Sequence, residues 1–213
     1  LPGFQFGGME HVGATLYNDT QLFLGPNPTP DEELRRIQLI AHETAHAWFG
    51  NLVTMDWFDD VWTKEVFANH FSAWITEPLF PSVNHKLQRM RTFFASALSE
   101  DRTPGTNAIH QEMDNLRNAG LIYGQIIYNK APVVMGKIIE LMGEDAFREG
   151  IREYLRTYAY SNATWDDLIH ILDRHTPEDL IAFNDAWVNR KGMPIIRFTP
   201  RGNTLEIRQK DRY

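Results

Sequence analysis

The clearest pattern of apolar and polar positions in the chain predicts an amphipathic helix that begins near residue 30. Thr29 and Glu32 have the spacing of a capping box, and Pro30 suits the first helical position. Acidic residues follow in the first turn, where the helix dipole favours negative charge. Gly50 offers a terminator for this helix. The apolar positions at helical spacing are Leu34, Ile37, Ile40, Ala41 and Ala45.

Helical patterns continue through most of the chain, whereas strand-like patterns occur near its two ends. Strands are predicted over 12–17 and 21–24, and again over 195–198 and 204–208, with turn residues between the members of each pair. Further helices are expected over about 59–76, 83–98, 130–142, 144–158, 165–174 and 179–190. The chain is therefore predicted to be an α+β, mostly α, protein.

Composition narrows the class of protein. Hydrophobic residues make up 43% of the 213 residues, enough for a core and too many for a disordered chain. A net charge of -7 argues against a nucleic-acid-binding surface, which is normally basic. The absence of cysteine excludes disulfides and thiolate metal ligands. No apolar run reaches about 18 residues, so no transmembrane segment is expected in this chain.

The first residues give no targeting signal. Leu1-Pro2-Gly3-Phe4 has neither a basic start nor an apolar stretch, so it does not resemble a signal peptide. Because the sequence lacks an initiator Met and opens in strand-like sequence, we expect it to begin inside a longer protein. Any targeting segment would then lie upstream, and the localisation stays open.

The first predicted helix carries an H-E-x-x-H sequence, His42-Glu43-Thr44-Ala45-His46. Residues four apart share a helix face, so both imidazoles can reach one metal ion. A catalytic zinc site adds a third protein ligand and keeps one position for water. Glu65 lies on the next predicted helix, which the intervening loop allows to fold back alongside the first. We therefore expect one zinc ion, held by His42, His46 and Glu65.

Other residues near the motif have predicted roles of their own. Glu43 lies about 100° around the helix from His42, so it can take a proton from the attacking water and pass it to the departing amine. Asn69 either supports a metal ligand by a hydrogen bond or is an ordinary polar surface residue.

The Trp and Phe residues between 48 and 74 are expected to form the core that joins the two ligand helices. The histidines expected to be ordinary polar residues are His70, His85, His110, His170 and His175.

Four segments spread over nearly the whole chain carry recognisable motifs. The first is Gly7-Gly8-Met9-Glu10-His11. The second runs over 42–54 and 62–68, with eighteen residues between the second histidine and the glutamate. The third is Tyr128-Asn129-Lys130-Ala131, and the fourth runs over 187–194. In content and order they resemble the motifs of the aminopeptidase N family of gluzincin zinc metallopeptidases, which also includes the leukotriene hydrolases.

The resemblance implies roles for two more residues. Glu10 matches the glutamate of the Gly-x-Met-Glu-Asn exopeptidase motif and would bind the free α-ammonium group of a peptide. Tyr128 matches the tyrosine that stabilises the tetrahedral intermediate. Three positions depart from the family pattern. His11 replaces the usual Asn, Val66 replaces the Gly that follows the glutamate ligand, and Ala131 replaces the Gly at the end of the tyrosine motif. None of these departures removes a metal ligand, a carboxylate or the phenol, so catalytic competence is expected, with an altered amine site near His11.

The resemblance also implies a fold and a reaction. Residues 1–193 would be a thermolysin-like zincin catalytic domain, truncated at its N-terminus, and 194–213 would begin a following β-sandwich. The expected reaction is hydrolysis of the N-terminal bond of peptides with a free N-terminus, within a protein that has further domains. A thermolysin-like endopeptidase, which has no use for Glu10, and a catalytically silent binding or scaffold module stay open as alternatives. An epoxide hydrolase has no supporting residue pattern, and the preferred N-terminal residue and the oligomeric state are not specified.

Overall fold

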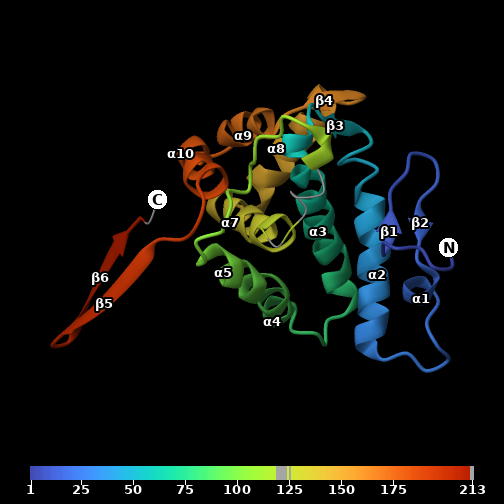
Figure 1. Cartoon of the computed structure of the whole chain (residues 1–213), viewed down its shortest axis with the longest axis horizontal. Helices are drawn as coiled ribbons and strands as arrows, with labels where there is room; N and C mark the ends of the chain where they lie inside the picture. Colours follow the sequence, from blue (N-terminus) through green and yellow to red (C-terminus); the bar gives the residue numbers. More distant parts are fainter. Residues whose placement is uncertain (119–123, 125, 212–213) are drawn as a thin grey trace.

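The chain is mostly helical, with short strands in two-stranded sheets (Figure 1). The computed structural model describes residues 1–118, 124 and 126–211. None of the helices in these residues has the length and apolar character needed to cross a bilayer. The predicted α+β, mostly α, class is confirmed. The longer helices are α2 (Pro30–Ala45), α3 (Trp62–Thr76), α7 (Ala131–Met142), α8 (Glu144–Thr157) and α9 (Trp165–Asp173).

Helix α2 forms because its start is strongly specified. The Thr29 side chain accepts a hydrogen bond from the Glu32 backbone, and the Glu32 carboxylate accepts one from the Thr29 backbone, so the predicted capping box is present. The helix ends at Ala45, earlier than the predicted stop at Gly50. Gly50 instead has a φ of 125°, which glycine adopts without strain, in the turn that follows the helix. Helices α2 and α3 pack side by side (Figure 1).

The predicted strands at the N-terminus are wrong in their extent. Strand β1 (Gly8–Met9) pairs antiparallel with β2 (Leu16–Tyr17), and the segment predicted as the second strand, 21–24, begins within helix α1 (Asp19–Leu22). The Asn18 side chain caps this helix by accepting a hydrogen bond from the Thr20 backbone N–H. Residues assigned to a turn between two strands therefore start a helix. Strand β1 contacts α2, which places the first motif beside the second.

The predicted helix over 83–98 is present but longer and irregular. Asn84 caps α4 (His85–Arg89), which continues as a π-helical segment (Met90–Phe94) and then α5 (Ala95–Asp101). A π-helical stretch shifts the phase of the apolar pattern, so periodicity alone does not reveal it. The helix expected over 59–76 is preceded by a 3-10 turn at Phe58–Asp60.

The later helices lie close to their predicted positions. Helices α7, α8 and α9 begin and end within about two residues of the expected bounds, in line with the uncertainty of any helix boundary. The last predicted helix is α10 (Leu180–Asn184), which continues as a π-helical segment over Asp185–Asn189.

A short parallel sheet, not predicted, links two distant parts of the chain. Strand β3 (Val53–Met55), just after the turn that follows α2, pairs with β4 (Ser161–Ala163), just before α9. Val53 and Ala163 are buried. Strands this short cannot show the alternation from which a strand is recognised in sequence.

The core lies among α3, α7, α8 and α9, with Trp62 and Phe67 fully buried on α3. The Trp62 ring lies 4.5 Å, centroid to centroid, from the ring of Trp165 on α9. Phe67 stacks on Phe49 at 4.3 Å, which joins α3 to the turn after α2. These rings fix the α3 backbone, and with it the position of Glu65.

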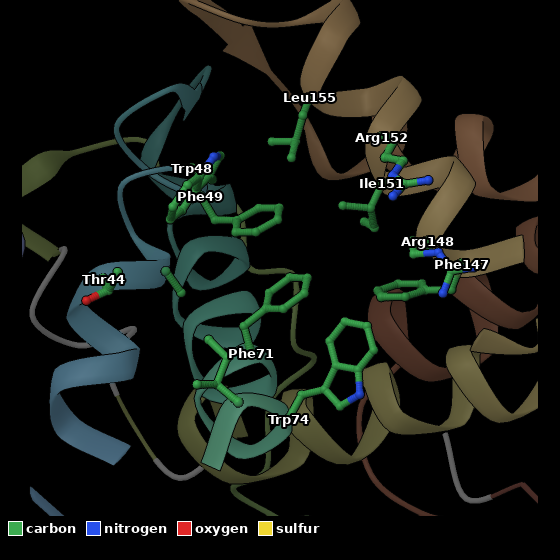
Figure 2. Close-up of a pocket in the computed structure, with 12 residues that line it drawn as sticks. Thr44, Trp48, Phe49, Phe71, Trp74, Phe147, Arg148, Ile151, Arg152 and Leu155 are labelled. Atoms are coloured by element: carbon green, nitrogen blue, oxygen red, sulfur yellow. The ribbon is translucent and has the colours of Figure 1, made fainter. Parts of the chain in front are cut away.

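The expectation that all aromatic residues between 48 and 74 belong to the core is only partly correct. Trp48, Trp57 and Trp74 are 43–49% exposed. Trp48 and Trp74 border an apolar pocket of about 280 Å³, in which residues of α2 and α3 face Phe147 and Ile151 of α8 (Figure 2). This pocket is separate from the two imidazoles of the motif, because neither His42 nor His46 lines it.

The two predicted C-terminal strands are confirmed. Strand β5 (Ile195–Arg201) pairs antiparallel with β6 (Thr204–Lys210) around a turn in which Gly202 has a φ of 60°. The hairpin extends away from the helical body (Figure 1), and its apolar side chains are exposed. The assignment of 194–213 to a following domain stays a prediction, and residues 212–213 lie outside the described residues.

Candidate metal centre

The structure brings His42, His46 and Glu65 together between α2 and α3. The two imidazole Nε2 atoms are 3.2 Å apart. The Glu65 Oε2 atom lies 3.4 Å from the His42 Nε2 and 3.8 Å from the His46 Nε2. Both histidines come from the last turn of α2 and its C-cap, and Glu65 comes from the first turn of α3.

These separations fit a tetrahedral zinc site. Nitrogen and oxygen ligands lie about 2.0–2.1 Å from zinc, which places tetrahedral ligand atoms about 3.3 Å from one another. Two imidazole nitrogens and one carboxylate oxygen are a donor set that zinc accepts, and three protein ligands leave a fourth position for water or substrate. The residues present therefore fit the ion.

Neighbouring groups orient both imidazoles. The His46 Nδ1 lies 3.1 Å from the Phe49 carbonyl oxygen, and this contact assigns the proton to Nδ1 and leaves Nε2 as the acceptor that a metal needs. The Asn69 side chain hydrogen-bonds to His42. Of the two interpretations of Asn69, the structure therefore favours support of a ligand.

Electrostatics favour the ionised form of Glu65, the candidate carboxylate ligand. Burial acts to raise the pKa of Glu65, but the hydrogen bond to His42 and the charges of His46 and Lys64 outweigh it and lower the pKa. For His42, burial acts to lower the pKa, and Glu65 outweighs burial and raises it. Burial lowers the pKa of His46, which favours the neutral form that a metal ligand must have.

Glu43 lies beside the ligands and is 6% exposed. Burial, reinforced by the negative charges of Glu10 and Glu65, raises its pKa to about 7, although His42 acts in the opposite direction. Its carboxylate packs against Gly8 of β1 so closely that a Cβ on Gly8 would overlap it. A cation held by the neighbouring ligands would favour the ionised form of Glu43.

Glu10 lies next to the same group and forms an ion pair with Lys64 of α3. Its carboxylate is close enough to Glu43 and His46 for these three side chains to share a cation. The Asn51 side chain donates a hydrogen bond of 2.9 Å to the Glu10 carbonyl oxygen, which ties the first motif to the turn after α2. Burial acts to raise the pKa of Glu10, but the hydrogen bond to Lys64, a backbone hydrogen bond and the charges of His46 and Lys64 together outweigh burial and lower the pKa.

Lys64 is a charged residue of the site whose role was not predicted from the sequence. Besides its ion pair with Glu10, its Nζ lies 3.5 Å from the Glu65 Oε1. The available signal was its position immediately before Glu65, but only the fold shows that Lys64 contacts Glu10, which follows β1.

Tyr128 comes from a different element. It lies in a π-helical segment, Ile126–Lys130, that packs against α3 and α5, and its side chain is 39% exposed. A hydrogen bond of 3.1 Å joins its backbone N–H to the Gly124 carbonyl oxygen. Its role in the chemistry stays a prediction.

His70 is not the ordinary polar residue that was expected. Its ring makes edge contacts with Phe71 and Phe147, at centroid distances of 5.3 and 5.7 Å. Burial, followed by the positive charge of Arg89, lowers its pKa to about 4. His70 therefore stays neutral in the folded protein at physiological pH.

His110 also has charged neighbours that the sequence did not suggest. Its Nε2 lies 3.9 Å from carboxylate oxygens of both Asp59 and Asp60. Asp60 has a structural task, because its Oδ2 accepts a hydrogen bond of 2.9 Å from the Trp165 backbone N–H at the start of α9. This group therefore joins the turn before α3 to the start of α9.

A two-histidine, one-glutamate group carried by paired helices is a donor set typical of the zinc metallopeptidases as a class. A family model described as the peptidase family M1 domain matches residues 1–187, and the chain belongs to this family. The resemblance to the aminopeptidase N family is thereby confirmed.

Curated relatives match nearly all of the chain. It is 30% identical over 210 residues to a leucyl aminopeptidase of Saccharolobus solfataricus, covering 99% of this chain and 27% of the relative. It is 31% identical over 217 residues to an aminopeptidase N of Lactococcus lactis subsp. lactis, covering 99% and 25%. It is 32% identical over 202 residues to a puromycin-sensitive aminopeptidase of Caenorhabditis elegans, covering 94% and 21%. The chain spans about a quarter of the length of these relatives.

Proposed function

We propose that the full-length protein is a zinc-dependent aminopeptidase that hydrolyses the N-terminal bond of peptides. The observation that carries this proposal is the position of Glu10, whose carboxylate lies beside Glu43 and His46 rather than on a distant surface. An exopeptidase needs a fixed anion about one residue's length from the metal, because an ammonium group buried without a partner is costly. The names of the relatives support the same activity.

Zinc bound by His42, His46 and Glu65 would supply a Lewis acid that polarises the scissile carbonyl and makes water more acidic. Glu43 is the general base of this proposal: it takes a proton from the attacking water and delivers it to the departing amine. Its buried position beside the metal ligands, where a bound cation would favour the ionised form, suits the uptake of that proton.

Two further elements complete the substrate site in this proposal. Glu10 holds the α-ammonium group, and the backbone beside β1 pairs with the substrate as an added strand. Tyr128 donates a hydrogen bond to the oxyanion that develops at the scissile carbonyl. The fold around these groups is that of a thermolysin-like zincin, over 1–193, followed by the start of a β-sandwich over 194–213.

The test compares one peptide series with free and with acetylated N-termini, using the full-length protein. An aminopeptidase cleaves the free series and leaves the acetylated one nearly untouched. Comparable cleavage of both series would favour the endopeptidase alternative. Binding of zinc and peptide without turnover of either series would identify a catalytically silent module.

A further inference from the structure

A buried ion pair lies behind the segment that carries Tyr128. The Lys130 Nζ is 3.0 Å from the Asp101 Oδ1, and both side chains are more than nine-tenths buried. The Thr106 hydroxyl, itself fully buried, donates a hydrogen bond of 3.0 Å to the same carboxylate oxygen. The end of α5 and the loop after it thus meet the end of the π-helical segment.

Such a pair is weak evidence for stability, and its best-attested use is to fix the register of the segments that carry it. The cost of removing two charges from water offsets most of their attraction, so well-packed apolar residues often serve stability as well. What a buried pair does impose is one arrangement, because either charge left unpaired in the interior is unfavourable. The arrangement imposed here is that of α5 against residues 126–130.

The segment is anchored on both sides of Tyr128. Ile126 and Ile127 are buried before it, and Lys130 is buried two positions after it. Tyr128 itself is 39% exposed, whereas Ile127 before it and Lys130 after it are buried. Single-turn π-helical segments occur frequently at functional sites.

We propose that the Asp101–Lys130 ion pair, completed by Thr106, positions the Tyr128 phenol for its part in catalysis. This inference rests on the proposed function. Asp101 and Lys130 are positioning residues rather than catalytic ones, because their charged groups are buried against each other and act through the backbone of residues 126–130. A displacement of the phenol by about 1 Å is enough to lower turnover by up to 10²-fold.

The first test measures kcat, KM and zinc content of the full-length Asp101→Asn variant with an N-terminal aminoacyl substrate. We expect kcat to fall at least about tenfold, with KM within about twofold and zinc content unchanged, since substrate and metal are held by other residues. Glu140→Gln, which breaks the exposed Lys137–Glu140 pair on α7, is the matched control and should leave kcat unchanged. An unaltered kcat in Asp101→Asn would overturn the inference.

A second variant separates positioning from folding. Asp101→Asn leaves the buried Lys130 charge unpaired and should lower the Tm. The double variant Asp101→Leu, Lys130→Met replaces the ion pair by an apolar pair of similar size and should restore the Tm to that of the wild type. If the pair positions Tyr128, kcat stays low in this variant although Tm has returned. Recovery of kcat together with Tm would show that the pair serves only the fold, and the inference would be wrong.

A double-mutant cycle distinguishes failure of this inference from failure of the proposed function. Tyr128→Phe alone should lower kcat roughly 10²- to 10³-fold, and Asp101→Asn should then add little, because the group it positions is gone. An unchanged kcat in Tyr128→Phe contradicts the catalytic role of the phenol itself. If Asp101→Asn lowers kcat by the same factor in the wild type and in Tyr128→Phe, only the positioning role is contradicted, and the role of the phenol stands.

Discussion

Lys64 forms an ion pair with Glu10, the carboxylate proposed to hold the substrate's ammonium group. The Lys64 ammonium also lies 3.5 Å from the Glu65 carboxylate. One lysine thus connects the proposed amine site to a proposed metal ligand. A substrate ammonium that binds Glu10 would lie beside the positive charge of Lys64. The proposed amine site can therefore be tested by substituting either Glu10 or Lys64.

Glu10→Ala should reduce kcat/KM on substrates with a free N-terminus at least tenfold, or about 1.4 kcal/mol, because the ammonium loses its anion. Residual cleavage of acetylated substrates should change little. The measurement compares both substrates in the full-length protein, with Glu149→Ala, which breaks the exposed pair with Arg152 on α8, as control. Equal losses on both substrates would show that Glu10 serves the fold or the metal site instead.

Lys64→Met should lower KM for substrates with a free N-terminus severalfold, because it removes the charge that competes with the substrate ammonium for Glu10. KM for a matched substrate without an ammonium group should not fall. Lys137→Met, on the exposed face of α7, is the control. A KM that rises or stays constant would mean that Lys64 holds Glu10 in its productive position rather than competing for it.

Glu65→Ala should cause severe loss of zinc, because two imidazoles remain where a catalytic site needs three protein ligands. Metal analysis of the full-length variant after dialysis measures this directly. Glu33→Ala, in the first turn of α2, removes a carboxylate distant from the ligands and serves as the comparison. Wild-type zinc content in Glu65→Ala would rule out Glu65 as the third ligand.

Glu43→Gln should retain zinc and lose nearly all turnover, because an amide cannot accept the proton that the carboxylate takes from water. The change keeps the shape of the side chain against Gly8, so the fold is not perturbed. Zinc content and kcat are measured on the same preparation. Turnover close to that of the wild type would assign the general base to another residue.

His70 gives a prediction about stability and pH. Its pKa in the folded protein is about 4, against about 6.5 in the unfolded chain, because burial and Arg89 disfavour its charge. Between these values the unfolded state binds a proton that the folded state does not. The stability associated with neutral His70 is therefore complete above about pH 6.5 and is lost as the pH falls towards 4.

The His70→Phe variant removes this titration and keeps an aromatic ring beside Phe71 and Phe147. The urea midpoint of the full-length variant should fall less steeply than that of the wild type between pH 6.5 and 4. His170→Phe, on the exposed face of α9, is the control and should follow the wild type. Parallel profiles for wild type and His70→Phe would contradict the assigned pKa.

The sequence predicted those parts of the fold and site that local signals determine. Helix α2 follows from its capping box, and the shared helix face of His42 and His46 follows from their spacing. The approach of Glu65 required only a loop that lets α3 fold back. These features depend on residues that are near one another in the chain.

The features that were missed depend on distant residues. No local pattern indicates that Lys64 meets Glu10, which immediately follows β1, or that β3 pairs with β4. The start of α1 was misread because Asn18 suits a turn and a helix cap equally well. The low pKa of His70 results mainly from burial, to which Phe71 of α3 and Phe147 of α8 contribute. Only the folded chain shows that His70 contacts both of these rings.

The parallel pairing of β3 with β4 has a consequence for synthesis of the protein on the ribosome. Val53 follows helix α2 closely, but its partner Ser161 emerges more than a hundred residues later. At about 5–20 residues per second, the β3 strand waits roughly 5–20 s for its partner. The support of the candidate metal site therefore forms late, after α7 and α8 have been made, and a nascent chain that ends before Ser161 carries His42, His46 and Glu65 without the finished β3–β4 pairing.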